Sequence, residues 1–175
     1  MSLLQRLFAP FVRSGPDPRE TMRPVYDTVV AEARRTEWYA GGGVADTVPG
    51  RFDMVSAVLA AVLLRMERGD DLAQSSAYLT ELFIHDMDGQ LRELGIGDIV
   101  VGKHVGKLMG AMGGRLDAYR AGLEGSDAEL TEAVQRNVHF GERGNAAQIA
   151  TGLRTLSNRL ARTGDEALLR GEIAA

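Results

Sequence analysis

The 175-residue chain has the length of one ordinary domain, and its 45% hydrophobic residues are enough to bury a core without disulfides or metals. It has no cysteine, so disulfides, thiolate metal sites and a cysteine nucleophile are excluded. A net charge of -4 and a pI near 5.4 argue against a protein that coats nucleic acid, and we expect no DNA partner. The lack of cysteine is consistent with a reducing compartment, so we expect a cytoplasmic protein.

The N-terminal segment differs from the rest of the chain. Four apolar residues have helical spacing there: Leu3, Leu4, Leu7 and Phe8. The segment lacks the long apolar centre and cleavage site of a signal peptide, so we expect residues 1–20 to form an N-terminal arm or short helix. We favour an arm that packs on the body, with contact to a membrane surface or a partner as the alternative. Residues 21–175 are expected to form a single α-helical domain.

Hydrophobic periodicity predicts helices almost throughout, and no strand pair joined by a hairpin turn is evident. The predicted helices cover about 24–35, 52–68, 70–94, 102–123, 127–138, 145–162 and 165–173. Glycines 41–43 and the Pro49-Gly50 pair bracket a predicted loop. The chain is therefore predicted to be all-α, a single-domain irregular helical bundle of about six to eight helices.

Three of these helices carry more specific signals. The helix at 52–68 is so apolar that we expect it at the centre of the fold. Its apolar run is too short to cross a bilayer. Ser126 and Glu129 predict a capping box at the start of the helix at 127–138. The helix at 102–123 carries an apolar stripe of Val105, Leu108, Met109, Met112, Leu116, Tyr119 and Leu123.

The helix at 70–94 places polar groups on its inner side. At about 100° per residue, Asp86 and Gln90 lie within its apolar arc, whereas His85 and Asp88 lie opposite. A carboxylate in an apolar arc is costly unless it is paired. We therefore expect Asp86 to form a buried ion pair or to accept hydrogen bonds from loop amides.

One segment imitates a phosphate-binding loop. Gly97, Gly102 and Lys103 match its spacing, but His104 stands where a serine or threonine should hold magnesium. The preceding segment is also predicted as a helix, whereas the motif requires a strand. We interpret the segment as a turn between helices.

A metal site is also not predicted. Glu81, His85 and Asp88 share one face of a helix, but the ligands that a dinuclear bundle site needs on other helices are missing. We expect neither a metal nor a cofactor.

Four aspartates are candidates for general acid/base chemistry, because a buried carboxylate can acquire a shifted pKa. They are Asp46, Asp53, Asp86 and Asp98. We expect them, together with Gln90, to be structural instead, since arginines are available as partners: Arg51, Arg92 and Arg115. An enzyme of unknown reaction would need one pocket that joins the aspartates.

Four glycines are spaced by four residues on the helix at 102–123: Gly102, Gly106, Gly110 and Gly114. Each costs roughly 1 kcal/mol of helix stability relative to alanine, so four glycines at this spacing require a structural or functional explanation. We favour close approach by a second helix of this chain, with a helix of a client protein or flexibility as the alternatives.

A series of short strings, taken together, is similar to one known family. The strings are WY at 38–39, GVADT at 43–47, GRFDM at 50–54, LAQ at 72–74, DMD at 86–88, LRE at 91–93, GIGD at 95–98, VGK at 101–103 and GRLDAY at 114–119. In this order and spacing, over roughly residues 25–125, they resemble the ubiquinol-cytochrome c chaperone family. The chain departs from the family pattern at Val58, His85, Gly106 and Gly113, so we assign no fixed polar role to these positions.

The resemblance implies an α-helical, non-enzymatic assembly factor for the cytochrome bc1 complex. Its mitochondrial members bind newly made cytochrome b and work near the ribosomal tunnel exit with a small partner protein. This short chain, which has no targeting presequence, resembles a bacterial member. The expected partners are therefore cytochrome b or another bc1 subunit, and we also consider the ribosome and peripheral contact with the inner face of the cytoplasmic membrane.

The corresponding hypothesis is that a groove beside the 54–64 and 102–119 helical segments shelters an apolar segment of cytochrome b. The candidates for client contact are Trp38, Tyr39, Arg51, Met109, Met112, Arg115 and Tyr119. Methionine side chains suit adaptable apolar contacts, although methionines at helical spacing are more often core residues. The alternative is a ribosome- or RNA-binding protein with a basic patch of Lys103, His104, Lys107, Arg154, Arg159 and Arg162.

Overall fold

The computed structural model describes the backbone of residues 17–93 and 98–175, and the side chains of these residues except 90–93, 98–109 and 111. Its elements are the 3-10 helix η2 (Pro18–Met22), α1 (Arg23–Ala33), the π-helical turn η3 (Glu37–Gly41), α2 (Val48–Met66), α3 (Ala73–Glu93), α4 (Asp98–Glu124), α5 (Asp127–Asn137), α6 (Ala146–Arg162) and α7 (Asp165–Leu169). The all-α prediction is confirmed, and seven α-helices in the described residues agree with the expected six to eight. The expected N-terminal arm lies mostly outside the described residues.

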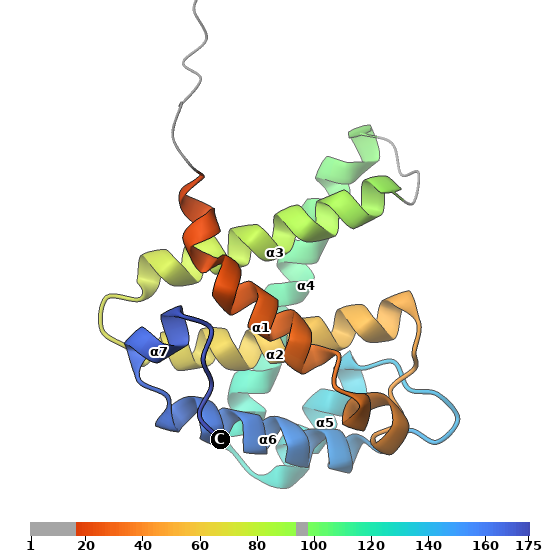
Figure 1. Cartoon of the computed structure of the whole chain (residues 1–175). Coiled ribbons are helices and arrows are strands. Elements are labelled where there is room, and N and C mark those ends of the chain that lie inside the picture. The colour runs from red at the N-terminus through yellow and green to blue at the C-terminus, as the bar shows by residue number, and fades with distance from the viewer. Residues whose placement is uncertain (1–16, 94–97) are drawn as a thin grey trace, which may run out of the picture.

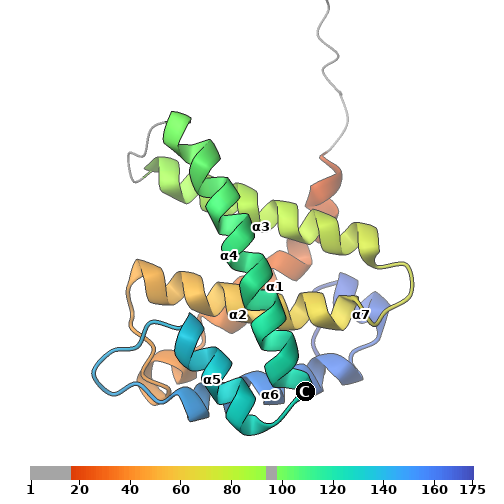
Figure 2. The same ribbon diagram turned by 180° about the vertical axis from the view of Figure 1, so that it is seen from behind.

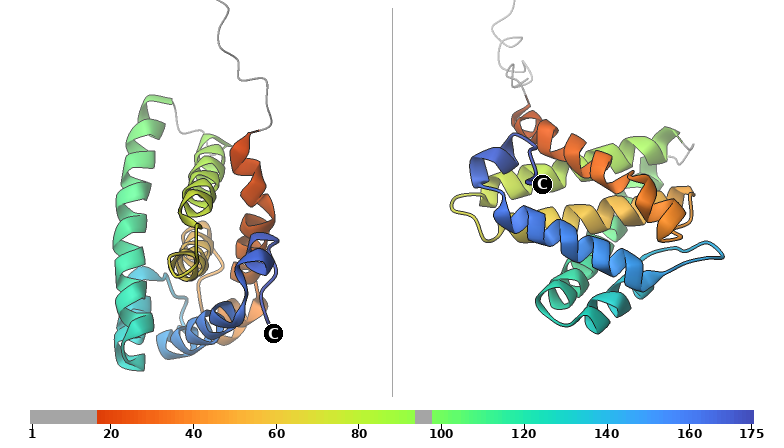
Figure 3. Two further views of the ribbon diagram at one scale, coloured as in Figure 1. Left: turned by 90° about the vertical axis from the view of Figure 1, so that its left-hand side faces the viewer. Right: turned by 60° about the horizontal axis from the view of Figure 1, so that its bottom comes forward.

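The helices form three layers around α2 (Figure 1). Seen from the side, α4 covers one face, α2 and α3 occupy the middle, and α1 lies on the opposite face (Figure 3). Helix α4 crosses both middle helices. The N-terminal half of α4 lies beside the C-terminal end of α3, and the two project beyond the rest of the bundle (Figure 2). Helix α6 runs along α2 on the side away from α3, and α5 packs against α4 and α6 (Figure 1).

The central position predicted for α2 is confirmed, because 14 of its 19 residues are buried. The buried set includes every residue from Asp53 to Leu64, so α2 presents no free apolar face. Val58, at one of the positions where the chain departs from the family pattern, is fully enclosed in this core.

The start of α2 corrects the predicted loop at Pro49-Gly50. Thr47 is the N-cap and accepts a hydrogen bond from the Gly50 amide, so both residues lie in the first helical turn. Proline is tolerated there because its missing N–H would have no intrahelical partner. Gly50 is required by close packing, since a Cβ atom would lie 2.0 Å from the Ala45 carbonyl oxygen.

The predicted helix ends agree with the structure to within four residues, and the largest differences are at the starts of α2 and α4 and at the end of α7. The Ser126–Glu129 capping box is confirmed at the start of α5. Helix α4 begins at Asp98, four residues before the predicted start at 102, and the element before it is helix α3 rather than a strand. Gly102 and Lys103 therefore lie within α4, so the predicted turn is wrong at these residues, and a preceding helix in place of a strand argues against a phosphate-binding loop.

The loop after α5 is tied to the segment before α2. The Ala45 amide donates to the His139 carbonyl at 2.9 Å, and the Gly141 amide donates to the Gly43 carbonyl at 2.9 Å. These bonds hold the start of α2 against the α5–α6 loop, and this contact brings His139 to the polar junction described next.

Candidate functional site

Asp53 is the centre of a polar junction that joins three parts of the chain. Its side chain is 1% exposed, and one carboxylate oxygen accepts a hydrogen bond from the Arg115 guanidinium of α4 at 2.7 Å. The other oxygen accepts from the backbone amide of His139 at 2.8 Å and also contacts the Nδ1 atom of its ring. Both oxygens are occupied, so this carboxylate acts as a clamp between α2, α4 and the α5–α6 loop.

Aromatic residues extend this junction to α3. The Arg115 guanidinium lies over the Phe52 ring at 5.2 Å, and Phe52 stacks on Phe83 of α3 with ring centres 6.0 Å apart. The Tyr119 hydroxyl is buried one helical turn beyond Arg115, and burial raises the pKa of this hydroxyl. The tyrosine therefore stays protonated at physiological pH and packs in the core.

The other aspartates of the proposed catalytic set have separate partners. Asp86, on α3, accepts a hydrogen bond from the Tyr26 hydroxyl of α1 at 2.7 Å. Burial and this bond raise the pKa of Tyr26. Asp46 is exposed and pairs with Arg51 at 2.6 Å, a bond that lowers the pKa of Asp46.

The described aspartates are therefore distributed among three local pairings rather than gathered at one reaction centre. The side chains of Asp98 and Gln90, which complete the predicted set of polar residues, lie outside the described ones. Among the described residues, no three histidine, aspartate or glutamate side chains lie close enough together to hold a metal ion.

The residues predicted for client contact divide into buried and exposed groups. Trp38, Met112 and Tyr119 are 6%, 6% and 1% exposed, so they contribute to the core in this conformation. Trp38 also donates its indole N–H to the Glu32 carbonyl at 2.7 Å. The side chain of Met109 lies outside the described ones.

Tyr39 and Arg51 are brought together at the surface. They line an open polar hollow of about 410 Å³ together with Arg34, Thr36 and Asp46. Arg115 is not part of this hollow, because its side chain is 14% exposed and turns toward Asp53. The predicted client-contact residues thus do not form one continuous surface.

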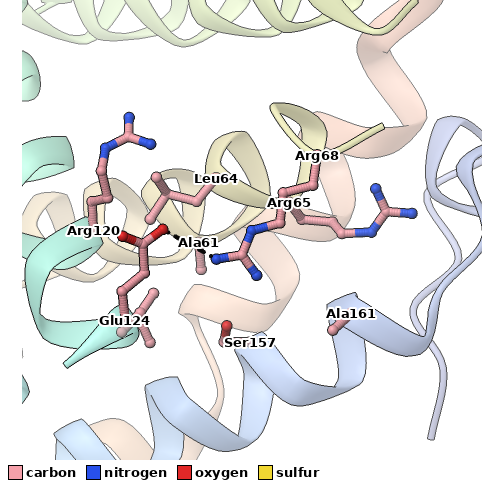
Figure 4. Close-up of a pocket in the computed structure, with 9 residues that line it drawn as sticks. Ala61, Leu64, Arg65, Arg68, Arg120, Glu124, Ser157 and Ala161 are labelled. Carbon is pink, nitrogen blue, oxygen red and sulfur yellow. Dashed lines mark hydrogen bonds and ion pairs between the residues drawn. The ribbon is translucent and has the colours of Figure 1, made fainter. Parts of the chain in front are cut away.

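An arginine cluster between α2, α4 and α6 was not predicted from the sequence. Figure 4 shows Arg65 on α2, Arg68 just after α2, and Arg120 and Glu124 on α4; Arg68 reaches toward Glu124, and Arg65 points the other way. Each guanidinium already has a carboxylate partner: Arg65 with Asp165 at 2.6 Å, Arg68 with Glu124 at 3.3 Å and Arg120 with Glu67. The enclosed space is about 10 Å³, which is room for about one water molecule. Only the i, i+3 spacing of Arg65 and Arg68 hinted at this cluster, which is structural.

The arginines of the proposed nucleic-acid patch on α6 also bind within the chain. Arg154 donates to the Gly122 and Leu123 carbonyls at the end of α4, each at 3.0 Å. Arg159 and Arg162 donate to the backbone carbonyls of the last two residues. The lysines and the histidine of the predicted patch, at 103, 104 and 107, have side chains outside the described ones.

The glycine row on α4 faces solvent where it is described. Gly110 and Gly114 are exposed, and a Cβ atom at either would meet nothing within 4 Å. The expected close approach by another helix of this chain is therefore wrong at these two positions. The reason is the helical phase, because α2 and α3 cover the opposite side of α4, where Met112 and Tyr119 are buried.

Comparisons with known proteins agree on one family. The family model described as "Ubiquinol-cytochrome C chaperone" matches residues 41–175. The crystal structure of the Cbp3 homolog from Brucella abortus is similar to this chain, with a TM-score of 0.77 and 30% sequence identity over 98% of this chain and 96% of that one. A search of the curated proteins found no match. None of the described helices has the length and apolar character needed to span a membrane.

Proposed function

The chain belongs to the ubiquinol-cytochrome C chaperone family, and from this membership we propose that it is a non-enzymatic assembly factor that binds newly made cytochrome b. In this role it promotes assembly of the cytochrome bc1 complex. The observation that carries the proposal is the family match over residues 41–175, which includes every element from α2 to the C-terminus. The paired and separated aspartates give no competing support to an enzymatic reaction.

The surface for the client must differ from the groove first expected beside α2. Helix α2 is buried along its whole apolar stretch, and α4 packs directly against it. We therefore place client contact on the outer side of α4, in the segment from Met109 to Arg115. The family-like string at 114–119 begins in this segment, and its backbone is open to solvent at Gly110, Gly113 and Gly114.

Exposed glycines suit contact with an apolar segment, because they let a second backbone come close to the helix. Arg115 borders this surface and is fixed by Asp53. The half-buried Tyr39 and the exposed Arg51 line a second area at the surface, and we assign to it a peripheral contact with the same client. Since cytochrome b is a membrane subunit, the protein would work in the cytoplasm at the inner face of the membrane.

Two experiments test the proposal. A deletion strain should lose assembled bc1 complex, and normal levels of the complex would exclude the function. Separately, a photo-crosslinking residue placed at Gly114 should capture cytochrome b in cells, since the structure leaves open space beside this position. The matched control is the same probe at Gln135, which is exposed on α5. Equal capture at both positions would remove α4 as the contact surface while leaving the assembly role open.

A ribosome contact receives less support from the geometry. The α6 arginines are engaged with carbonyl groups of this chain, so a phosphate contact would depend on the lysines at 103 and 107. Co-sedimentation with ribosomes over a range of salt concentrations distinguishes the cases. A steep loss of binding with salt would indicate a phosphate-dominated contact, and a shallow response would argue against it.

A further inference from the structure

An open groove lies between the end of α2 and the first half of α3. It has a volume of about 750 Å³. Met66 and Leu72 lie buried beneath it, while the half-buried Ile84 and the exposed Ala73 and Ala77 provide accessible apolar surface along α3. The small alanine side chains leave room for side chains of another segment.

The rim of this groove is acidic. Glu67, Asp71 and Glu81 contribute carboxylates, and neither lysine nor arginine is among the lining residues that the structure describes. Glu67 is paired with Arg120 from α4, whereas Asp71 and Glu81 are exposed. A segment that combines apolar residues with positive charge is the complementary occupant.

The N-terminal 16 residues of this chain have that composition. They contain Arg6 and Arg13 but no acidic residue, and their large apolar residues include Leu3, Leu4, Leu7, Phe8, Phe11 and Val12. The described part of the chain begins beside the groove. The pKa of Arg19 is raised mainly by its hydrogen bond to Asp17 and also by the nearby carboxylate of Glu81, a groove residue.

The docked segment is joined to the described chain by residues 14–16, which span up to about 10 Å when extended. Because Arg19 lies near the groove residue Glu81, this short connection brings the segment onto the groove from the Glu81 side. The α3 wall from Ala73 to Ile84 is about 17 Å long at 1.5 Å per residue. We propose that residues 3–13 bind in the groove between α2 and α3 of their own chain, with the apolar side chains against its floor and Arg6 and Arg13 at its acidic rim.

Covalent attachment favours this occupant over a free partner. A short tether holds its end at an effective concentration of about a millimolar, so an intrinsic Kd below about a millimolar is enough for the arm to occupy the groove. The groove is then covered in the free protein. A basic amphipathic segment of another protein would have to displace the arm before it could bind there.

The absence of cysteine provides a direct test in the full-length protein. Leu7→Cys is combined with Ala77→Cys in the groove, and the matched control combines Leu7→Cys with Gln135→Cys, an exposed position on α5. Under mild oxidation of the dilute protein, we expect an intramolecular disulfide to form at least about tenfold faster in the groove pair. Similar rates in the two pairs would overturn the proposal.

Charge variants of the groove pair test the rim. Arg6→Glu with Arg13→Glu should slow disulfide formation several-fold, and so should Asp71→Asn with Glu81→Gln. Asparagine is chosen because Asp71 has a φ of 57°, a left-handed conformation that asparagine tolerates. If the rate is insensitive to all four substitutions, the acidic rim does not bind the arm and this part of the proposal fails.

Two further outcomes identify other occupants. Disulfide-linked dimers in dilute solution, in place of the intramolecular product, would assign the groove to the arm of a second copy. The second test uses vesicles that contain an anionic phospholipid. Sedimentation of the protein with the vesicles measures whether the arm binds them. If the arm binds vesicles while the groove pair reacts no faster than the control pair, the arm is a membrane contact. Either result would overturn docking within the chain.

Discussion

Replacement of the exposed glycines of α4 by alanine should stabilise the protein. At Gly110 and Gly114 an added Cβ atom meets nothing within 4 Å, so the substitution has no steric cost. Alanine is favoured over glycine in a helix interior by about 1 kcal/mol, because it restricts the unfolded backbone. The Gly110→Ala/Gly114→Ala double variant should therefore gain up to about 2 kcal/mol of unfolding free energy, the sum of the two single effects.

The same helix provides an opposite control. A Cβ atom at Gly122 would lie 2.7 Å from the Cα atom of Leu130 and 2.9 Å from a methyl carbon of the same residue on α5. Gly122→Ala must push α5 away from α4, and overpacking of this kind costs about 1 to 3 kcal/mol. Replacement of glycine by alanine is thus expected to raise the unfolding free energy at position 114 and to lower it at position 122.

Urea denaturation followed by circular dichroism measures both effects, and thermal unfolding should show a shift of about 2 to 4 °C per kcal/mol for a chain of this size. A loss of stability in the double variant would refute the exposed position of this glycine face. Assembly of the bc1 complex measured in the same strains adds a functional comparison. If the more stable variant assembles less complex, the glycines serve client contact, since misfolding cannot explain the loss.

Three further changes test the junctions described above. Asp53→Ala should cost about 3 kcal/mol of unfolding free energy in urea, because it leaves the largely buried Arg115 without its carboxylate, and a cost below 1 kcal/mol would contradict the clamp. Ser126→Ala should cost about 1 kcal/mol through loss of the capping box, measured in the same way, and an unchanged midpoint would contradict the cap. The hydrogen bonds from Arg19 lower the pKa of Asp17 to about 2 from 3.8, so any stability from this pair is complete above pH 3.8 and is lost as the pH falls toward 2. In an NMR titration, Arg19→Ala should return the Asp17 pKa toward 3.8, and a pKa that stays near 2 would assign the shift to another group.

Local sequence signals predicted the helices because their causes lie within one or two turns. The apolar character of α2 follows from its own residues, and the capping box of α5 needs only Ser126 and Glu129. The Pro49-Gly50 pair misled for a related reason, since the same dipeptide is acceptable in a turn and in the first turn of a helix. The close Ala45 carbonyl that requires Gly50 is visible only in the folded chain.

The polar contacts could not be predicted in the same way. Arg115 and His139 are 62 and 86 residues from Asp53, and no spacing rule connects them. Helical phase did indicate that Asp86 faces inward, but the Tyr26 hydroxyl was not among the expected partners. The glycine row shows the limit most clearly, since its spacing defines one face of α4 but does not say whether protein or solvent covers that face.

Helix α4 is divided by these contacts into two parts with different tasks. From Arg115 onward it is fixed by Asp53, by the burial of Tyr119, and by Arg154, which binds carbonyl groups at its end. Before Arg115, the exposed side of the helix carries glycines with open space beside them. Because the fixed part holds the helix in place, a change in the exposed part can alter client contact without loss of the core. The proposed function and the stability of the fold can therefore be tested by separate substitutions on a single helix.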